Sequence, residues 1–404
     1  MKLLLPLVAT LAVVALVSAN HTHTVHLQRR VSFLNDKNEL DVKALASHSN
    51  MLDDKYNTAM GNYKKHNKKN HPFLRMLRGG KRANKGHVLL RDVSHEQLWA
   101  GEISFGGQKF YIDFDTGSAD TFVNHDAYDP AKSQTSMATN KVFQAAYADG
   151  KSAGGVVYLD VIHIGGIECK NVPIGRVDHR FVTQQLNQGI MGLAFPAISA
   201  LGQEYPPAFI SLTRQEAVAQ PIFQMTLKAG RGSSLYLGSI DKSQMSGNIS
   251  YTDAQTTTGF WATKAAVNGL PITAIIDSGT TLINGPSNEV SQLFGLLKGI
   301  TPFHAMGLLL GSYDCEQTPS ITFEIAGKKV KLSRSQTRFG TVSGGRCVLP
   351  VAGKPTMPLN GWVLGDPFMQ AQSVVFDMDQ NRLGFADQAD TSTSSRAADE
   401  ADDD

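Results

Sequence analysis

The two halves of this chain repeat the same order of residues, and this repeat limits the folds that the sequence can form. The stretch YIDFDTGSADTFV at 111–123 has a counterpart in TAIIDSGTTLING at 273–285, where an apolar run again ends in Asp, a hydroxyl residue and Gly. GIMGLAFP at 189–196 and WVLGDPFM at 362–369 follow, each with two apolar residues before Gly. A single internal duplication of this kind predicts two similar lobes rather than a solenoid.

Short apolar runs separated by glycine dominate the chain from residue 98 onward. Stretches such as KFYIDF, GGVVYLDVIHIGG, PITAIID and SVVFDMD have the length and the alternation of strands. Helical patterns are few, near 207–218 and 287–298. The sequence therefore predicts a mostly β protein, with a first lobe over 83–238 and a second over 239–388.

The first 19 residues have the features of a secretory signal peptide. Met1 and Lys2 precede an apolar run at 3–17, and small residues follow it. This run is too short for a membrane anchor, and no later stretch reaches spanning length. We therefore expect a secreted protein, or one sent to a secretory-pathway compartment such as the vacuole.

The leader and the body of the chain have opposite charges. Residues 1–82 contain 14 Lys and Arg against 5 Asp and Glu, a net charge of +9, whereas residues 83–404 contain 24 against 31, a net charge of −7. The two parts are expected to attract each other. Because 20–82 ends in a dibasic pair suited to a processing protease, it is interpreted as a pro-segment, with a disordered tail as the alternative. Export argues against nucleic-acid binding, and 389–404 is predicted to be a disordered acidic tail.

Three cysteines leave one thiol unpaired in an oxidising compartment. Cys315 and Cys347 can close a loop in the second half, which leaves Cys169 as a buried free thiol, although sequence does not fix this pairing. Asn248 begins an Asn-Ile-Ser sequon and is a candidate for glycosylation.

The repeated triplets place a carboxylate at the start of a tight turn in each half, at Asp115 and Asp277. One such triplet is weak evidence, but here each ends an apolar run and each has its own downstream apolar-apolar-Gly. Over about 95–388 the sequence thereby resembles a pepsin-like aspartic protease of the secreted or vacuolar fungal kind. The resemblance implies a bilobal fold of two β-barrel-like lobes with the active-site cleft between them.

The resemblance also implies a mechanism. Asp115 and Asp277 would share one proton, as the carboxyl pairs of aspartic proteases do, and would activate a water molecule for attack on a peptide carbonyl. No metal, cofactor or covalent intermediate is implied. Six residues would support the pair: Thr116, Gly117, Ser118, Ser278, Gly279 and Thr280. The first hydroxyl residue of each triplet would tie the loops together, the next hydroxyl would hydrogen-bond the outer carboxylate oxygen, and the glycines would allow backbone amides to approach.

The stretch FQAAYADGKSAGG matches the flap hairpin that covers the cleft in this family. Tyr147 would be the flap tyrosine, and Asp149-Gly150 is a strong turn pattern in its own right. The alternative for Tyr147 is an ordinary strand aromatic. The family usually has Trp where this chain has Phe122, whose ring cannot donate a hydrogen bond to the flap tyrosine.

Asp113 and Asp149 are expected at the primary substrate pocket. Asp113 lies two positions before Asp115 and so shares its face of the strand. Their charge would admit Lys beside the cleaved bond as well as Phe or Leu, unless Asp149 only shapes the turn. An extended peptide is the expected substrate.

Pro-segments of this family lie in the cleft, where a lysine pairs with the catalytic carboxylates until acid weakens the pairs. A lysine within 64–69 is the expected inhibitor here. The sequence thus predicts a monomeric, pepstatin-sensitive endopeptidase that is made as a zymogen and acts at acidic pH. The alternatives are a catalytically inactive pepsin-like binding protein, which the intact triplets disfavour, and a structural β protein with coincidental triplets.

Overall fold

The computed structural model describes residues 33–35, 39–66, 86–92, 99–146, 152–178, 188–229, 232–342, 344–355, 357 and 360–389. Several sequence-based predictions lie outside these residues. They are the signal peptide at 1–19, the dibasic pair at 81–82, the flap residues Tyr147, Asp149 and Gly150, and the acidic tail from 390 onward.

The described residues form two large sheets, as expected for a mostly β protein. Thirteen strands of the first sheet are described: β1 (Gly86–Asp92), β2 (Trp99–Phe105), β3 (Gln108–Asp115), β4 (Thr121–Val123), β5 (Met137–Ala146), β6 (Ser152–Ile164), β7 (Ile167–Val177), β8 (Gly189–Gly192), β9 (Ile222–Thr226), β10 (Ser233–Leu237), β11 (Met245–Asp253), β22 (Ser373–Asp377) and β23 (Arg382–Gln388).

The second sheet comes from the second half of the chain. Its described strands are β12 (Ala262–Val267), β13 (Leu270–Ile276), β14 (Ile283–Pro286), β15 (Thr301–Ala305), β16 (Leu308–Tyr313), β17 (Thr322–Ile325), β18 (Lys328–Lys331), β19 (Thr341–Val342), β20 (Arg346–Lys354) and β21 (Trp362–Leu364). The described helices are α1 (Val42–Lys65), α2 (Ala208–Arg214), α3 (Ser287–Leu296) and α4 (Asp366–Met369). Helices α2 and α3 lie where the sequence predicted them.

The internal repeat has a direct counterpart in strand pairing. Strand β3 runs parallel to β8, with Asp115 opposite Gly192, and β13 runs parallel to β21, with Ile276 opposite Leu364. In each half the strand after the triplet then pairs antiparallel with the same partner, β4 with β8 and β14 with β21. The two halves therefore build the same local fold, and the prediction of two similar lobes is confirmed.

The last strands of the chain pair with strands from the first half. Strand β22 lies beside β9, and β23 lies between β22 and β11. At this junction Phe223 of β9 stacks on Phe376 of β22, with ring centroids 4.6 Å apart. Both rings belong to one buried apolar cluster with residues from both halves of the chain. Burying side chains of this size stabilises a fold by about 1.5–3 kcal/mol each. The boundary between 238 and 239 remains a prediction.

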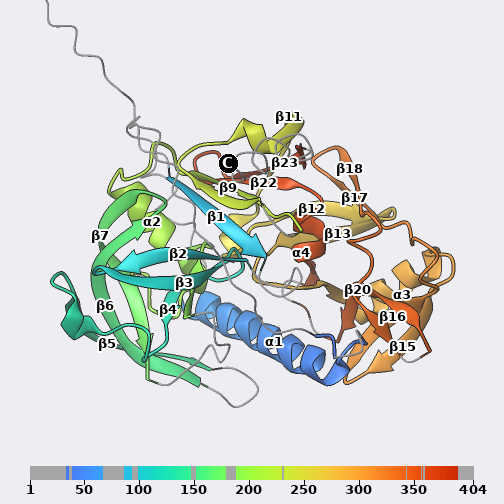
Figure 1. The fold of residues 1–404 in the computed structure, drawn as a ribbon, viewed down its shortest axis with the longest axis horizontal. Coiled ribbons are helices and arrows are strands. Elements are labelled where there is room, and N and C mark those ends of the chain that lie inside the picture. Colours follow the sequence, from blue (N-terminus) through green and yellow to red (C-terminus); the bar gives the residue numbers. More distant parts are fainter. Residues whose placement is uncertain are drawn as a thin grey trace, which may run out of the picture.

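Helix α1 lies within the basic segment and contacts both halves of the molecule (Figure 1). Asp41 caps it by accepting a hydrogen bond from the Ala44 amide at 2.9 Å. Leu45, Leu52 and Tyr56 recur at helical spacing and are buried against the body. This helix was not among the helices predicted from the sequence. None of the helices in the described ranges is long and apolar enough to cross a membrane.

The predicted disulfide is confirmed, because Cys315 and Cys347 are bonded, with their Cα atoms 5.0 Å apart. Cys169 is a buried free thiol, as expected, and burial raises its pKa to about 11. Asn248 is exposed in an irregular part of β11, so its amide can be reached by a glycosylating enzyme. Its glycosylation stays a prediction.

Candidate active site

The two triplet aspartates lie at equivalent places in the two halves. Asp115 ends β3, and Asp277 directly follows β13. Both are buried, with 3% and 0% of their surface exposed. The two carboxyl groups are within hydrogen-bonding reach of each other. The fold therefore brings together two acids that are 162 residues apart in sequence.

Each carboxylate is held by the same two kinds of donor. The amide of Gly117 donates to Asp115 Oδ1 at 2.9 Å, and the Ser118 hydroxyl donates to Oδ2 at 2.6 Å. In the second half Gly279 and Thr280 donate to Asp277 in the same way, again at 2.9 and 2.6 Å. These contacts fix the orientation of both acids before any substrate binds.

Thr116 and Ser278 join the two triplets. The amide of Thr116 donates to Ser278 Oγ at 3.1 Å, and the amide of Ser278 donates to Thr116 Oγ1 at 3.0 Å. The two hydroxyls then donate across the interface to the carbonyl oxygens of Ile276 and Phe114. This reciprocal set of bonds holds the two loops, and so the two aspartates, in register.

Gly117 and Gly279 pack against the opposite carboxylate. A Cβ atom added at Gly117 would lie 2.5 Å from Asp277 Cγ, and one added at Gly279 would lie 2.3 Å from Asp115 Oδ1. Real Cβ atoms do not approach so closely. Any larger residue at either position would therefore push the two carboxyl groups apart.

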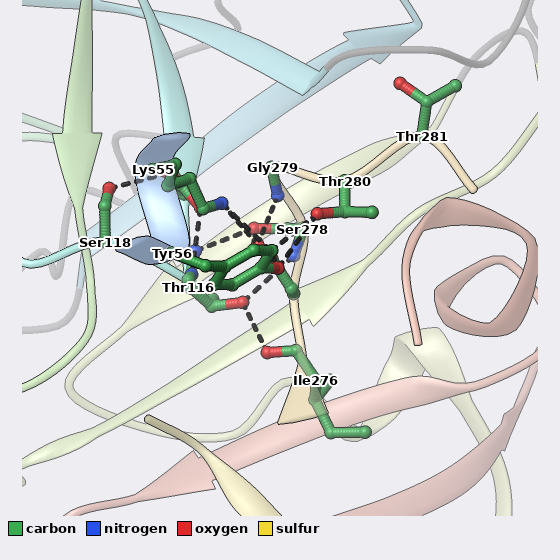
Figure 2. A network of polar contacts seen from close by, with 12 residues as sticks. Lys55, Tyr56, Thr116, Ser118, Ile276, Ser278, Gly279, Thr280 and Thr281 are labelled. Carbon is green, nitrogen blue, oxygen red and sulfur yellow. Dashed lines mark hydrogen bonds and ion pairs between the residues drawn. The ribbon is translucent and has the colours of Figure 1, made fainter. Parts of the chain in front are cut away.

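Two residues of α1 complete this network (Figure 2). The Lys55 ammonium donates to Asp115 Oδ1 at 2.8 Å and to Asp277 Oδ2 at 2.9 Å. The Tyr56 hydroxyl donates to Asp277 Oδ2 and lies 3.2 Å from Thr280 Oγ1. The space directly between the two acids is thus filled by the basic segment.

Lys55, Asp115 and Asp277 shift one another's pKa values. Burial alone would raise the pKa of Asp277, but Lys55 and the hydrogen bonds of its neighbours outweigh burial and lower it to about 2. Burial raises the pKa of Asp115, which Lys55 opposes and Asp277 reinforces. Burial would lower the pKa of Lys55, but the two acids raise it. The pKa values of the two acids are thus driven apart, as in a pair that shares one proton.

The expectation of an inhibitory lysine within 64–69 is wrong for the part of that range that is described. Lys64 and Lys65 are exposed at the end of α1, while 67–69 lie outside the described residues. Lys55 occupies the position instead. The spacing of Leu45, Leu52 and Tyr56 in the sequence could have revealed the helix, and with it the lysine that faces the body.

The other predicted site residues are placed as follows. Asp113 is buried in β3, opposite Ala100 of β2 and Ile190 of β8. Phe122 is buried and stacks on Phe143, with ring centroids 5.2 Å apart. The strands that flank the predicted flap tip, β5 and β6, pair as far as Ala146 and Ser152. The roles of all these residues stay predictions.

Comparison with known proteins decides the family. The sequence profile described as eukaryotic aspartyl protease matches residues 98–388. The chain belongs to the eukaryotic aspartyl protease family. Secreted aspartyl protease 1 of Malassezia globosa is 44% identical over 365 residues, which covers 90% of this chain and 92% of that protein. An aspartic protease of Phaffia rhodozyma is 32% identical over 74% of this chain and 79% of its own. Aspergillopepsin-1 of Emericella nidulans is 30% identical over 75% of this chain and 82% of that protein.

Membership of the aspartyl protease family confirms the predicted bilobal fold and the predicted class of enzyme, an aspartic endopeptidase. The aligned stretch with the Malassezia globosa protein is longer than the matched domain. The similarity therefore extends beyond the aspartyl protease domain itself. Helix α1 precedes that domain in sequence and lies outside the match.

Proposed function

We propose that this protein is a secreted aspartic endopeptidase, made as a zymogen, in which Asp115 and Asp277 are the catalytic pair. One observation carries the proposal: two buried carboxyl groups within reach of each other have matching supporting contacts from the two halves. The Malassezia globosa relative is named a secreted protease. That name and the predicted signal peptide at 1–19 support secretion.

The proposed chemistry needs one proton on the pair. The ionised carboxylate takes a proton from a water molecule, whose oxygen then attacks the carbonyl carbon of the peptide bond. The protonated carboxyl gives its proton to the carbonyl oxygen. When the tetrahedral intermediate collapses, the leaving nitrogen receives a proton from the pair and the C–N bond breaks. A hydroxyl of the intermediate gives its proton to the pair as the carbonyl re-forms, so the pair again holds one proton.

Residues 20–82 are proposed to inhibit the enzyme from within. Lys55 and Tyr56 occupy the space where a water molecule and a peptide carbonyl would have to lie. Asn62 Nδ2 donates to the Ile198 carbonyl at 3.2 Å on one side. On the other side the Leu40 amide donates to the Thr341 carbonyl. A helix held at both ends in this way excludes an extended substrate, and pepstatin-like inhibitors with it.

Acid should release this helix. Lys55 lowers the pKa of Asp277 and opposes the rise in the pKa of Asp115, so the ionised Asp277 carboxylate favours its docking. The contribution of Asp277 is therefore complete above the ordinary carboxyl pKa, about 3.9. It is lost as the pH falls towards the docked pKa of Asp277, about 2. Docking weakens over this window.

Acidification of the purified full-length chain from about pH 6 to about pH 3 is expected to switch on peptide hydrolysis, because that drop crosses the upper part of the window. Loss of the pro-segment should accompany the activity. Both are measured together, by cleavage of a fluorogenic peptide and by the mass of the chain. Full activity at pH 6 without processing would contradict the proposed inhibition.

A further inference from the structure

A second charged contact joins α1 to the body of the protein. In the contact at the aspartates α1 supplies the cation, whereas here α1 supplies the carboxylate and the body supplies the cation. Lys354, at the end of β20, donates from its ammonium to the Ser49 carbonyl at 3.0 Å and to Asp53 Oδ1. Its side chain is only 4% exposed. Burial lowers the pKa of Lys354, while Asp53 and Asp54 oppose this. Among the described residues, the hydrogen-bond partners of this ammonium both belong to α1.

This contact lies close to the catalytic pair. Lys354 pairs with Pro286 at the end of β14, the strand that follows the second triplet loop. On α1, Asp53 precedes Lys55 by two residues and Ser49 precedes it by six. At a rise of 1.5 Å per residue these steps are about 3 Å and about 9 Å along the helix axis. Lys354 therefore contacts α1 at a level within about 10 Å of Lys55 along the helix axis.

Removal of α1 changes the surroundings of Lys354 completely. The ammonium loses the Asp53 carboxylate and the Ser49 carbonyl, and the groove in front of it becomes free for substrate. A cation that faces a peptide-binding groove favours a peptide with an anionic side chain at the matching position. In the zymogen the Asp53 carboxylate occupies the place that such a side chain would take.

We infer that Lys354 forms a subsite for an acidic side chain of the substrate, and that Asp53 fills this subsite in the zymogen. The inference rests on the proposed function. An extended chain advances about 3.3 Å per residue, so the axial offset of about 3 to 9 Å from Lys55 corresponds to no more than about three positions from the cleaved bond. A substrate glutamate then accepts a hydrogen bond from the Lys354 ammonium.

The test is a matched peptide series. Glutamate and glutamine are placed in turn at each of the three positions on either side of one cleavable bond, and kcat/KM is measured for the acid-activated enzyme. At about pH 5 most of the glutamate is ionised, and one position should favour glutamate by about tenfold. The preference should shrink as the pH is lowered to about 3, where the carboxyl is protonated.

Variants then assign the preference to Lys354. Lys354→Met should remove it, and Lys354→Arg should keep it, because both Lys and Arg donate to carboxylates. Lys331→Met is the matched control, since Lys331 is an exposed lysine on β18, on the far side of the second half from α1 (Figure 1). This control should keep the preference.

The possible results of these experiments distinguish the inferred Lys354 subsite from the proposed endopeptidase function. Equal cleavage of the glutamate and glutamine peptides by the wild-type enzyme at every position would overturn the inference and leave the proposed function intact. A preference that survives in Lys354→Met would do the same, and would leave Lys354 as an anchor for α1 alone. Failure to cleave any peptide of the series would instead overturn the proposed function.

Discussion

Replacing Asp277 by Asn is expected to lower kcat/KM for peptide hydrolysis by about 10⁴-fold, the upper range for loss of a general acid–base group. Asparagine keeps an acceptor for the Gly279 amide, and its side-chain NH2 can donate to the Thr280 hydroxyl, which then acts as acceptor. It cannot take a proton from water or pass one on. The fold should therefore survive while the chemistry does not.

The measurement must separate failed self-processing from failed catalysis. The Asp277→Asn chain is therefore processed by immobilised wild-type enzyme, and its activity is then compared with that of the wild type at equal concentration. Asp314→Asn is the control, because Asp314 is exposed and lies on the surface next to the disulfide. The control should stay within about twofold of the wild type. Activity of Asp277→Asn within tenfold of the wild type would rule out the proposed role.

Replacing Lys55 by Met is expected to weaken the docking of α1 by about 2 kcal/mol or more, or about 30-fold, because it leaves two buried acids without their cation. The variant keeps most of the length of the side chain but not its charge. The pair can relieve part of the cost by taking up a proton, so the effect is smaller than for an isolated buried ion pair. The full-length variant should bind pepstatin at about pH 6, where the wild-type zymogen does not.

Lys64→Met is the matched control for this experiment. Lys64 is on the same helix, but its side chain is exposed rather than docked at the aspartates. Its replacement should leave pepstatin binding and the pH of activation as in the wild type. If the two variants behaved alike, Lys55 would not be the group that blocks the pair.

The sequence was sufficient to predict the fold and the acids, because the chemistry of each triplet is local. The same order of strand, Asp, hydroxyl and Gly occurs twice, and each copy builds the same set of bonds around Asp115 or Asp277. The pairing of the two copies followed from the resemblance. The disulfide followed from the cysteine count and the compartment.

Contacts made across the groove could not be predicted in the same way. Which lysine reaches the aspartates depends on where α1 begins and on the face that it buries, and Lys55 lies outside the densely charged stretch at 62–82. Lys354 is in no motif at all. Its environment exists only when β20 and α1 lie side by side, so the sequence alone contains no sign of it.

Titration of the acid-activated enzyme with pepstatin tests the central claim, that Asp115 and Asp277 form one working catalytic pair. At about pH 4, within the usual range of such pairs, peptide hydrolysis should fall in proportion to added inhibitor and reach zero at one equivalent per chain. No hydrolysis at any pH between about 2 and 6, or hydrolysis that pepstatin leaves unchanged, would contradict the claim. The first of these results would instead support a pepsin-like protein that only binds its partners.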